Sequence, residues 1–448
     1  MMTPLTRRRL LECAALAGGI AALGLPRISQ ARQLVSPLNV VWWGEDEAPG
    51  IHRWIDDTLT RFQAETGVEL ISRLEDSAEV AEGFTRAASA GLDVPDVQFF
   101  WNGQFVMESV WRGLLLPLNG LVSHSVLKRS GATSHSVFDG KQYRVGFYTH
   151  GFGMAYNKRL FDRAGLNADD PPRTWDALLN ACDRLRSAGI VPIMGGVSDG
   201  FWGDWFLTNA LPQQLDSVQE ALQLFIGNLD WREPLYHDHW VHLEQLRQLG
   251  FLNDDITQLG MYDGLELFNG GHAAITFSVT ASLPNHLARL GADSVGFMVM
   301  PVFGRGKLAG QPIIDKQGFG IPTRAANPTT AARFLEFIHS KERVQAMWTL
   351  AHQIPADEAF DASVIDDPVM RDVVARYWGS SPILTIEDLM PLSFWNDAMF
   401  VASQKIVAGE MTGEEAGELA HSVTEAWRTS ASPEIVNNYA VWGNAGLD

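Results

Sequence analysis

Asn39-Val40-Val41-Trp42-Trp43 is the stretch from which the fold can be worked out. A short apolar run of this kind is typical of a buried strand, and the turn residues 44–46 end it. Apolar residues then recur every three or four positions from 51 to 62, which predicts a helix that ends at Gly67. A strand, a loop and a helix therefore follow one another at the start of the folded part.

The same order repeats directly afterwards. Residues 68–71 and 96–100 read as two further strands, and residues 77–90 read as a helix between them. Alternating strands and helices predict a parallel sheet with helices on both faces. In such sheets ligands lie beyond the carboxyl ends of the strands. The loops at 44–47 and 101–104 are therefore candidate binding loops.

A second α/β unit is predicted from residue 146 onward. Thr174 is a helix N-cap for the run 175–188. Residues 147–157 form a long run with few breakers except Gly. Further strands are predicted at 190–193, 273–277 and 295–299, and helices at 331–338, 344–350 and through a tail at 368–429. The chain has 448 residues, and because single cores stop growing near about 250–300 residues, two lobes are expected. No linker separates the units, so the lobes are expected to be joined by more than one crossing.

Composition excludes several classes of function. The formal net charge is -19, and no block of Lys and Arg occurs beyond the first ten residues. This argues against nucleic acid and anionic lipid as partners. No dinucleotide-binding, phosphate-loop or nucleophile-elbow motif is present. We therefore expect a protein that is not an enzyme and has no cofactor.

The first 31 residues have the form of an export signal. Three consecutive Arg at 7–9 precede an apolar run from 10 to 25, and Ala31 ends a stretch with small residues at cleavage-type positions. The pair of Arg followed by Leu predicts twin-arginine export, with the general secretory route as the alternative. After cleavage Cys182 would be the one remaining thiol, and we expect it to be a small buried hydrophobe.

Two alternative chemistries remain open. Glu45, Asp46 and Glu47 provide the carboxylates that a glycoside-active enzyme needs. His237, His239 and His242 have a spacing that a metal site can use. The apolar period of residues 240–249 instead predicts that His239 and His242 lie on the solvated face of a helix, so no metal is expected.

Tryptophan gives the strongest functional signal. Five indoles lie at or just after the ends of predicted elements, each beside a polar side chain. They are Trp43 beside Glu45, Trp101 beside Asn102, Trp202 and Trp205 on either side of Asp204, and Trp395 beside Asn396. Indole faces cover the C–H face of a pyranose, while carboxylates and amides bind its hydroxyl groups. The pattern predicts a carbohydrate site.

Residues 151–161 (GFGMAYNKRLF), followed by 171–176 (PPRTWD), resemble the sugar-binding branch of the extracellular solute-binding proteins of ABC importers. The resemblance spans nearly the whole chain after the signal. Its further marks are segments 95–97, 113–118, 267–274, 318–322 and 332–337. It implies two α/β lobes, each a sheet flanked by helices, joined by several hinge strands and closing over a sugar.

By position, the resemblance implies ligand-binding roles for residues of both lobes and of the hinge. The full set expected to bind the ligand is Trp43, Glu45, Asp46, Trp101, Asn102, Tyr148, His150, Trp202, Asp204, Ser278, Thr280, Gly318, Phe319, Trp395 and Asn396. Two departures put maltodextrin in doubt. Ser278-Val279-Thr280 stands where many members have Gly-x-Trp, and His150 stands where maltodextrin binders have an acid.

The expected protein is a periplasmic, soluble, monomeric substrate-binding component that delivers a neutral sugar, oligosaccharide or polyol to permease subunits. Anionic sugars are not expected, because the assigned loops contain carboxylates and no Arg or Lys. Residues 32–147 and about 280–343 are expected to form the first lobe, and residues 148–279 and about 344–448 the second.

Overall fold

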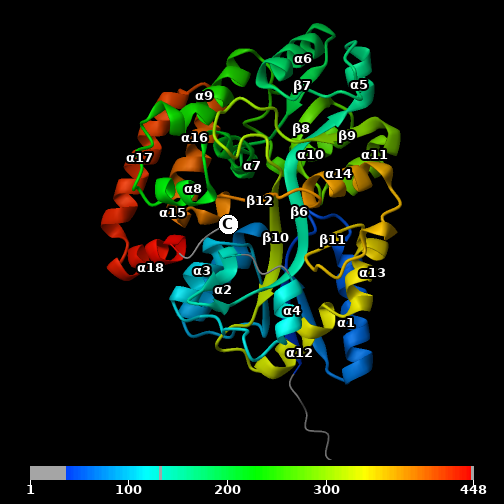
Figure 1. Ribbon diagram of the computed structural model, residues 1–448, viewed down its shortest axis with the longest axis vertical. Coiled ribbons are helices and arrows are strands. Elements are labelled where there is room, and N and C mark those ends of the chain that lie inside the picture. Colours follow the sequence, from blue (N-terminus) through cyan, green and yellow to red (C-terminus); the bar gives the residue numbers. More distant parts are fainter. Residues whose placement is uncertain (1–36, 131–133, 445–448) are drawn as a thin grey trace, which may run out of the picture. The chain divides into compact units, whose positions relative to one another are not determined.

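The computed structural model describes residues 37–130 and 134–444 (Figure 1). The predicted signal at 1–31 lies outside these residues. Strands are β1 (Leu38–Trp42), β2 (Leu70–Leu74), β3 (Val97–Phe100), β4 (Val137–Phe138), β5 (Lys141–Gln142), β6 (Val145–Asn157), β7 (Val191–Met194), β8 (Ala273–Val279), β9 (Val295–Met298), β10 (Ile313–Gly320), β11 (Ile354–Pro355) and β12 (Ile383–Leu384).

The helices begin with α1 (Ile51–Thr66), α2 (Ser77–Ser89), α3 (Gln104–Trp111), α4 (His124–Arg129), α5 (Lys158–Arg163), α6 (Trp175–Ser187), α7 (Phe201–Ala210), α8 (Val218–Phe225) and α9 (Pro234–Gln248). They continue with α10 (Met261–Asn269), α11 (Leu283–Leu290), α12 (Pro328–Ile338), α13 (Lys341–Ala351), α14 (Pro368–Trp378), α15 (Leu392–Phe394), α16 (Phe400–Ala408), α17 (Gly413–Ser430) and α18 (Pro433–Asn444). Short helical turns are η2 (Ser134–Ser136), η3 (Leu211–Gln214), η4 (Ala292–Ser294), η5 (Ala362–Val364), η6 (Glu387–Leu389) and the π-helical η7 (Trp395–Met399).

The main sheet has the strand order β2-β1-β3-β10-β6-β8-β7, with β9 and β11 paired to β6 and β12 paired to β10. The first three strands are parallel, as predicted from the sequence. Strand β10 is antiparallel to β3 and to β6, and β6 is antiparallel to β8. The fold is a two-lobed α/β architecture in which each lobe has a sheet flanked by helices.

Strands β6 and β10 connect the lobes (Figure 1). The first half of β6 pairs with β10, which in turn pairs with β3 of the first lobe. Its second half pairs with β8 and β9 of the second lobe. The sequence has a long run with few breakers at 147–157, close to β6, but predicts no strand at 313–320. The hinge strands are therefore only half visible in the sequence.

Local chemistry explains the predicted helix ends. Gly67 ends α1 with φ 70 and donates its N–H to the Gln63 carbonyl, a conformation that glycine adopts at little cost. Thr174 caps α6 by accepting the N–H of Ala177 at 3.3 Å, as predicted. Cys182 is fully buried on the inner face of α6, which confirms its expected packing role.

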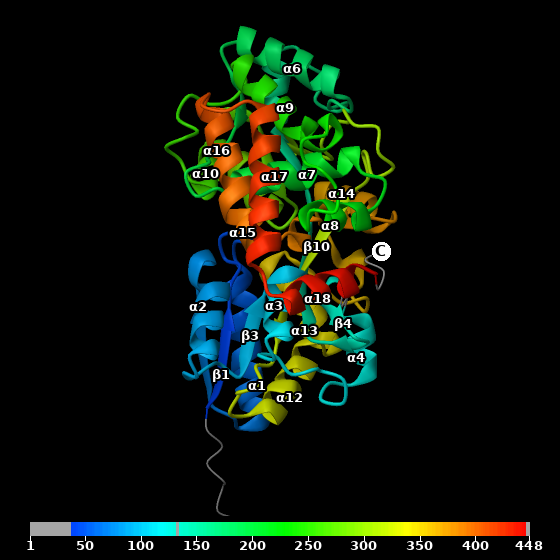
Figure 2. The ribbon, with the colours of Figure 1, turned by 90° about the vertical axis from the view of Figure 1, so that its left-hand side faces the viewer.

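Two helices lie elsewhere than the expected lobe boundaries imply. Helix α13 packs on α1 of the first lobe, although it falls largely within the segment expected in the second. Helix α11 packs on α10 and β9 of the second lobe, although residues 280–343 were expected in the first. Near the end of the described chain, α17 packs beside α9 and α16, and α18 contacts both α3 and α8 (Figure 2).

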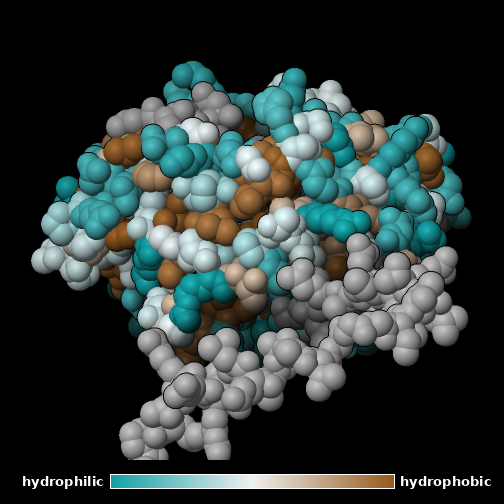
Figure 3. Space-filling view, turned by 90° about the horizontal axis from the view of Figure 1, so that it is seen from below, coloured by the Kyte–Doolittle hydropathy of each residue, from teal (hydrophilic) through white to brown (hydrophobic). Residues whose placement is uncertain are grey.

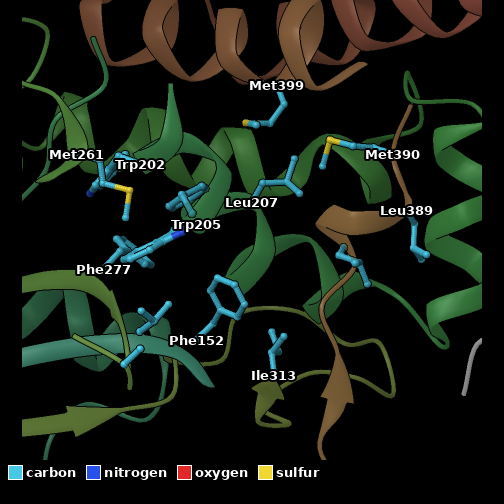
Figure 4. Close-up of a cluster of buried hydrophobic side chains, with 14 of the residues drawn as sticks. Phe152, Trp202, Trp205, Leu207, Met261, Phe277, Ile313, Leu389, Met390 and Met399 are labelled. Carbon is cyan, nitrogen blue, oxygen red and sulfur yellow. The ribbon is translucent and has the colours of Figure 1, made fainter. Parts of the chain in front are cut away.

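Buried apolar side chains form two clusters, and the surface is mixed. Figure 3 shows hydrophilic residues interspersed with apolar ones on one face. A cluster of buried aromatic and aliphatic side chains, labelled in Figure 4, lies between α7 and the hinge strands. Within residues 37–130 and 134–444, no helix combines the length and apolarity that a membrane span requires.

Candidate ligand-binding cleft

A cavity of about 50 Å³ lies where the ends of the first-lobe strands meet the second lobe. The loops after β1 and β3 contribute to it, as expected for carboxyl ends of parallel strands. The second lobe contributes the first turns of α7 and α10, together with η6 and η7. We call it the inner cavity, and its lining is Trp43, Glu47, Ser77, Trp101, Phe105, Phe201, Asp204, Trp205, Met261, Tyr262, Gln317, Glu387, Asp388 and Trp395.

Aromatic rings from both lobes meet at the inner cavity. Trp101 of the first lobe lies edge-on to Trp43, with ring centroids 5.1 Å apart. Trp395 of the second lobe lies 4.7 Å from Phe105 and 6.5 Å from Trp101. Phe201 lies 5.9 Å from Trp395 on the other side. Ring faces and edges thus surround the cavity and provide the apolar surface that a sugar ring needs.

A larger groove adjoins the inner cavity and has a volume of about 660 Å³. It shares Trp101, Phe105, Phe201 and Trp395 with the inner cavity. Asn396 also lines it. We call this the outer groove, because a ligand larger than the inner cavity can extend along it.

Three buried carboxyl groups of the second lobe face one another at the inner cavity. Burial raises the pKa of Asp204 to about 7, against the opposing effect of the neighbouring Glu387 and Trp395 side chains. Burial, followed by repulsion from Asp204 and Asp388, raises the pKa of Glu387. The pKa of Asp388 is raised by burial and by Asp315 behind it. Removing carboxylates from water without a compensating cation disfavours their charged form.

A polar network supports the floor of the inner cavity. Glu47 accepts a 2.8 Å hydrogen bond from the Tyr148 hydroxyl, and His150 Nδ1 lies 3.3 Å from the same carboxylate. Burial raises the pKa of Glu47. Asn102 donates to Asp315 at 3.3 Å and accepts from Ser136 at 2.7 Å. The network fixes the binding loops to β6 and β10.

The structure brings together part of the predicted set. Trp43, Trp101, Asp204 and Trp395 line the inner cavity, and Asn396 lines the outer groove. Trp205, one of the five indoles singled out in the sequence, also lines the inner cavity. Tyr148, His150 and Asn102 lie one layer behind, fully buried.

Trp202 was predicted to bind the ligand, but the structure places it in the core. It is 1% exposed and does not line the cavity. Its ring packs edge-on against Phe277 at 5.4 Å and fills the space that Gly195 leaves by having no Cβ (Figure 4). It is a core residue because the face of α7 that carries it points toward the sheet.

Six other predicted residues are also placed away from the inner cavity. Glu45 accepts hydrogen bonds from the backbone N–H groups of Gly50 and His52, and Asp46 is exposed. Ser278 is bonded to His286, and Thr280 accepts the N–H of Gly151. Gly318 and Phe319 are buried positions of β10 and do not line the inner cavity, although the adjacent Gln317 does.

The histidine cluster is a second correction. His239 and His242 were expected on a solvated face, but His239 is fully buried and His242 is half-buried. The helix α9 is covered by α16 and α17, two tail helices whose packing the apolar period of α9 alone does not reveal. In the part of the chain that the structure describes, no group of three His, Cys, Asp or Glu side chains could hold a metal ion.

Several lining residues are absent from the predicted set. Glu387 and Asp388 stand between apolar neighbours, Ile386 and Leu389, and this interrupted apolar run is a signal of buried acids. Tyr262 and Phe105 are the second residues of their helices. Phe105 directly follows the candidate loop 101–104, whereas no predicted strand end points to Tyr262.

Comparison with known proteins identifies the family. The family model described as bacterial extracellular solute-binding protein matches residues 45–344. A relative from Yersinia enterocolitica, named sn-glycerol-3-phosphate-binding periplasmic protein UgpB, is 30% identical over 250 residues, covering 52% of this chain and 54% of its own. A protein of the same name from Rhizobium meliloti is 25% identical over 196 residues, covering 43% and 40%. The chain thus spans about half the length of the curated relatives it matches.

Solved structures share the fold across most of the chain. A chitin oligosaccharide binding protein aligns with a TM-score of 0.77 at 20% identity, covering 88% of this chain and 99% of its own. The maltose/maltodextrin-binding domain MalE from Bdellovibrio bacteriovorus, bound to maltotriose, aligns with a TM-score of 0.68 at 15% identity, covering 88% and 100%. The chain belongs to the bacterial extracellular solute-binding proteins.

Proposed function

We propose that this protein is the periplasmic substrate-binding component of an ABC importer and that it captures a carbohydrate between its lobes. The main support is that indole and phenyl rings from both lobes surround a cavity that contains buried carboxyl groups. Aromatic faces bind the C–H surface of a sugar, and carboxyl groups bind its hydroxyls. Because Trp101 and Trp395 belong to different lobes, a bound ring would favour the closed form.

An anionic ligand fits this cavity poorly, although the curated relatives carry the name of glycerol 3-phosphate. Among the described residues, neither Lys nor Arg lines the inner cavity. Arg86 and Arg112 line the outer groove, but each is paired with a carboxylate, Glu79 at 2.7 Å and Glu108 at 3.2 Å respectively. A phosphate beside the buried carboxyl groups would be repelled.

A catalytic role for the loop after β1 has no support in the geometry. Both carboxylate oxygens of Glu45 accept hydrogen bonds that hold the start of α1. Hydrolysis of a glycoside needs two carboxyl groups that flank one bond. Because the Glu45 carboxylate is already hydrogen-bonded to the backbone at the start of α1, we propose that the protein binds its ligand without turnover.

A thermal-shift screen of the mature protein against mono-, di- and oligosaccharides, polyols and sugar phosphates tests the proposal. A ligand that binds only the folded state raises the melting temperature. A shift with neutral or amino sugars, and none with glycerol 3-phosphate, is the expected result. Appearance of hydrolysis products in the same incubations, or a response to glycerol 3-phosphate alone, would contradict it.

Localisation is tested separately. Replacing Arg8 and Arg9 by Lys should retain the precursor in the cytoplasm if the twin-arginine route is used. Release of the same variant by osmotic shock would show that another route exports it.

A further inference from the structure

The inner cavity contains an excess of acid. Its lining includes Glu47, Asp204, Glu387 and Asp388, and in the described part of the chain no Lys, Arg or His joins them. We propose that the ligand carries a positively charged amino group, held by Asp204, Glu387 and Asp388 within the aromatic ring of the cavity. Resting on the proposed sugar-binding function, this assigns the ligand class as an amino sugar with a free ammonium group, in place of the neutral sugar expected from the sequence.

Two of these carboxylates have unused hydrogen-bonding capacity. Asp204 is 6% exposed and Asp388 is 2% exposed. Oδ1 of Asp204 and Oδ2 of Asp388 have no hydrogen-bond partner among the described residues. Buried acceptors are normally satisfied, so unsatisfied ones at a cavity wall indicate a missing donor. An ammonium group offers three donors and the opposite charge.

The aromatic lining favours an organic cation over other donors. Trp101, Trp205, Trp395 and Tyr262 all line the same cavity as the carboxyl groups. Cations are attracted to the faces of such rings, and the attraction is strongest where water is excluded. A cavity of about 50 Å³ accommodates a small head group, and the attached ring would lie toward the outer groove.

The protein's own cations near the floor are already engaged. Arg144 donates to Ser136 and to the backbone carbonyls of Phe100 and Lys316. Lys316 is largely buried beside Asp315, where burial lowers its pKa, and it does not line the cavity. His150 lies behind Glu47 at 3.3 Å. None of these groups is hydrogen-bonded to Oδ1 of Asp204 or to Oδ2 of Asp388.

A metal ion is the other cation to consider. Among residues 37–130 and 134–444 no three acidic, His or Cys side chains converge closely enough to hold one. Metal ions also need several oxygen ligands at short distance and gain little from indole faces. The lining therefore selects an ammonium group.

Calorimetric titration with a matched pair of sugars tests the inference. The pair is the glucosamine disaccharide with two free amines and its N-acetylated form, which has the same rings and linkage without charge. We expect the free amine form to bind at least about tenfold more tightly. Spermidine and choline serve as ammonium compounds without a sugar, and glucuronate as the anionic control.

The variants Asp204→Asn and Glu387→Gln should lose the preference for the free amine form. Asp397→Asn is the matched control, because Asp397 is exposed, lies two residues from Trp395, and does not line the cavity. It removes the same charge and should keep the preference. Circular dichroism of each variant separates loss of binding from loss of folding.

The outcomes distinguish the inference from the proposed function. Equal or tighter binding of the acetylated disaccharide overturns the inference and leaves sugar binding intact. Binding of spermidine or choline, together with no binding of either disaccharide, supports the ammonium site and overturns sugar binding. Glucuronate binding, or no response to any compound, overturns the inference, and the thermal-shift screen against other sugars then decides the proposed function.

Discussion

The hydroxyl group of Tyr148 donates a 2.8 Å hydrogen bond to the Glu47 carboxylate. Glu47 lies in the loop after β1 and lines the inner cavity, whereas Tyr148 lies in β6, which pairs with strands of both lobes. Ser282, after β8, also donates to the Glu47 backbone carbonyl at 2.7 Å. The wall of the cavity is thereby tied to the strand on which the lobes hinge.

Tyr148→Phe should lower the free energy of unfolding by about 1–3 kcal/mol, because a buried acceptor loses its donor. The pKa of Glu47 is raised by burial and lowered by this hydrogen bond, so it rises further in the variant. A raised carboxyl pKa gives stability that is present at low pH and lost as pH rises. Urea unfolding should therefore show a larger deficit at about pH 8 than at about pH 4.

Tyr236→Phe is the matched control. Tyr236 donates to Glu220 at 3.1 Å outside the cleft. Both variants remove one tyrosine–glutamate hydrogen bond, but only Tyr148→Phe is expected to change ligand affinity. Equal affinities for the two variants would show that Glu47 does not depend on Tyr148 for its position.

Trp395→Ala and Trp202→Ala should differ in kind. Trp395 lines both the inner cavity and the outer groove, so its loss should weaken sugar binding by about 1–3 kcal/mol with a small change in melting temperature. Trp202 is buried against Phe277, and its loss should cost about 3–5 kcal/mol of stability. Calorimetry and urea unfolding on both variants check this; unchanged affinity in Trp395→Ala would remove it from the site.

The alternation of β1, α1, β2, α2 and β3 is visible in the sequence because each element has a regular apolar period. Strand β10 was not predicted, since Asp315 and Lys316 interrupt its apolar pattern. The structure explains the exception. The Asp315 carboxylate accepts from Asn102 beside the cavity, so its charge serves a polar network inside the sheet.

The binding site, like the fold, could be predicted only in part from local sequence patterns. Trp43 and Trp101 follow strands that the sequence identifies, and both line the cavity. Trp202 and Trp205 share one helix and one local pattern, yet only Trp205 faces the cavity. Which face of α7 is covered depends on Phe277 and Gly195, distant in sequence. A local pattern gives the residue type of a site but not the direction of each side chain.

His239 should make the protein sensitive to acid. Burial, followed by repulsion from His237, lowers its pKa to about 3. A histidine that is kept neutral in the fold gives stability that is present above its unfolded pKa of about 6.5 and lost as pH falls. Between pH 7 and pH 5 the free energy of unfolding of His239→Met should fall by about 2 kcal/mol less than that of the wild type. Urea unfolding at both values tests this, with the exposed His272→Gln as control; parallel losses in the wild type and His239→Met would contradict it.

Asp204 should have the opposite effect on the unliganded protein. Its pKa is raised to about 7 by burial, so its stability contribution is present below about pH 4 and lost as pH rises to 7. Asp204→Asn should therefore match the wild type at pH 4 and exceed its stability by about 2–4 kcal/mol at pH 8. Unfolding curves across this range check the crossover, and Asp397→Asn should show none. A variant that is less stable at pH 8 would contradict the assigned burial cost.

Gly103→Ala should weaken ligand binding by keeping the two lobes apart. Gly103 lies between β3 and α3 with φ 56, and a Cβ there would lie 2.1 Å from the backbone oxygen of Asp388. The side chain would push η6, with Glu387 and Asp388, away from the first lobe. We expect at least about a tenfold loss of affinity for the sugar that gives the largest thermal shift, measured by calorimetry.

The backbone strain of that substitution needs its own control. Gly113 has φ 71, and a Cβ there would meet nothing within 4 Å. Gly113→Ala therefore also places a side chain at a positive φ, at a cost of about 1–2 kcal/mol, without a clash. Both variants should lose stability, but only Gly103→Ala should lose affinity. If the two bind the sugar equally well, the close approach of Asp388 to the first lobe is not required for the bound state.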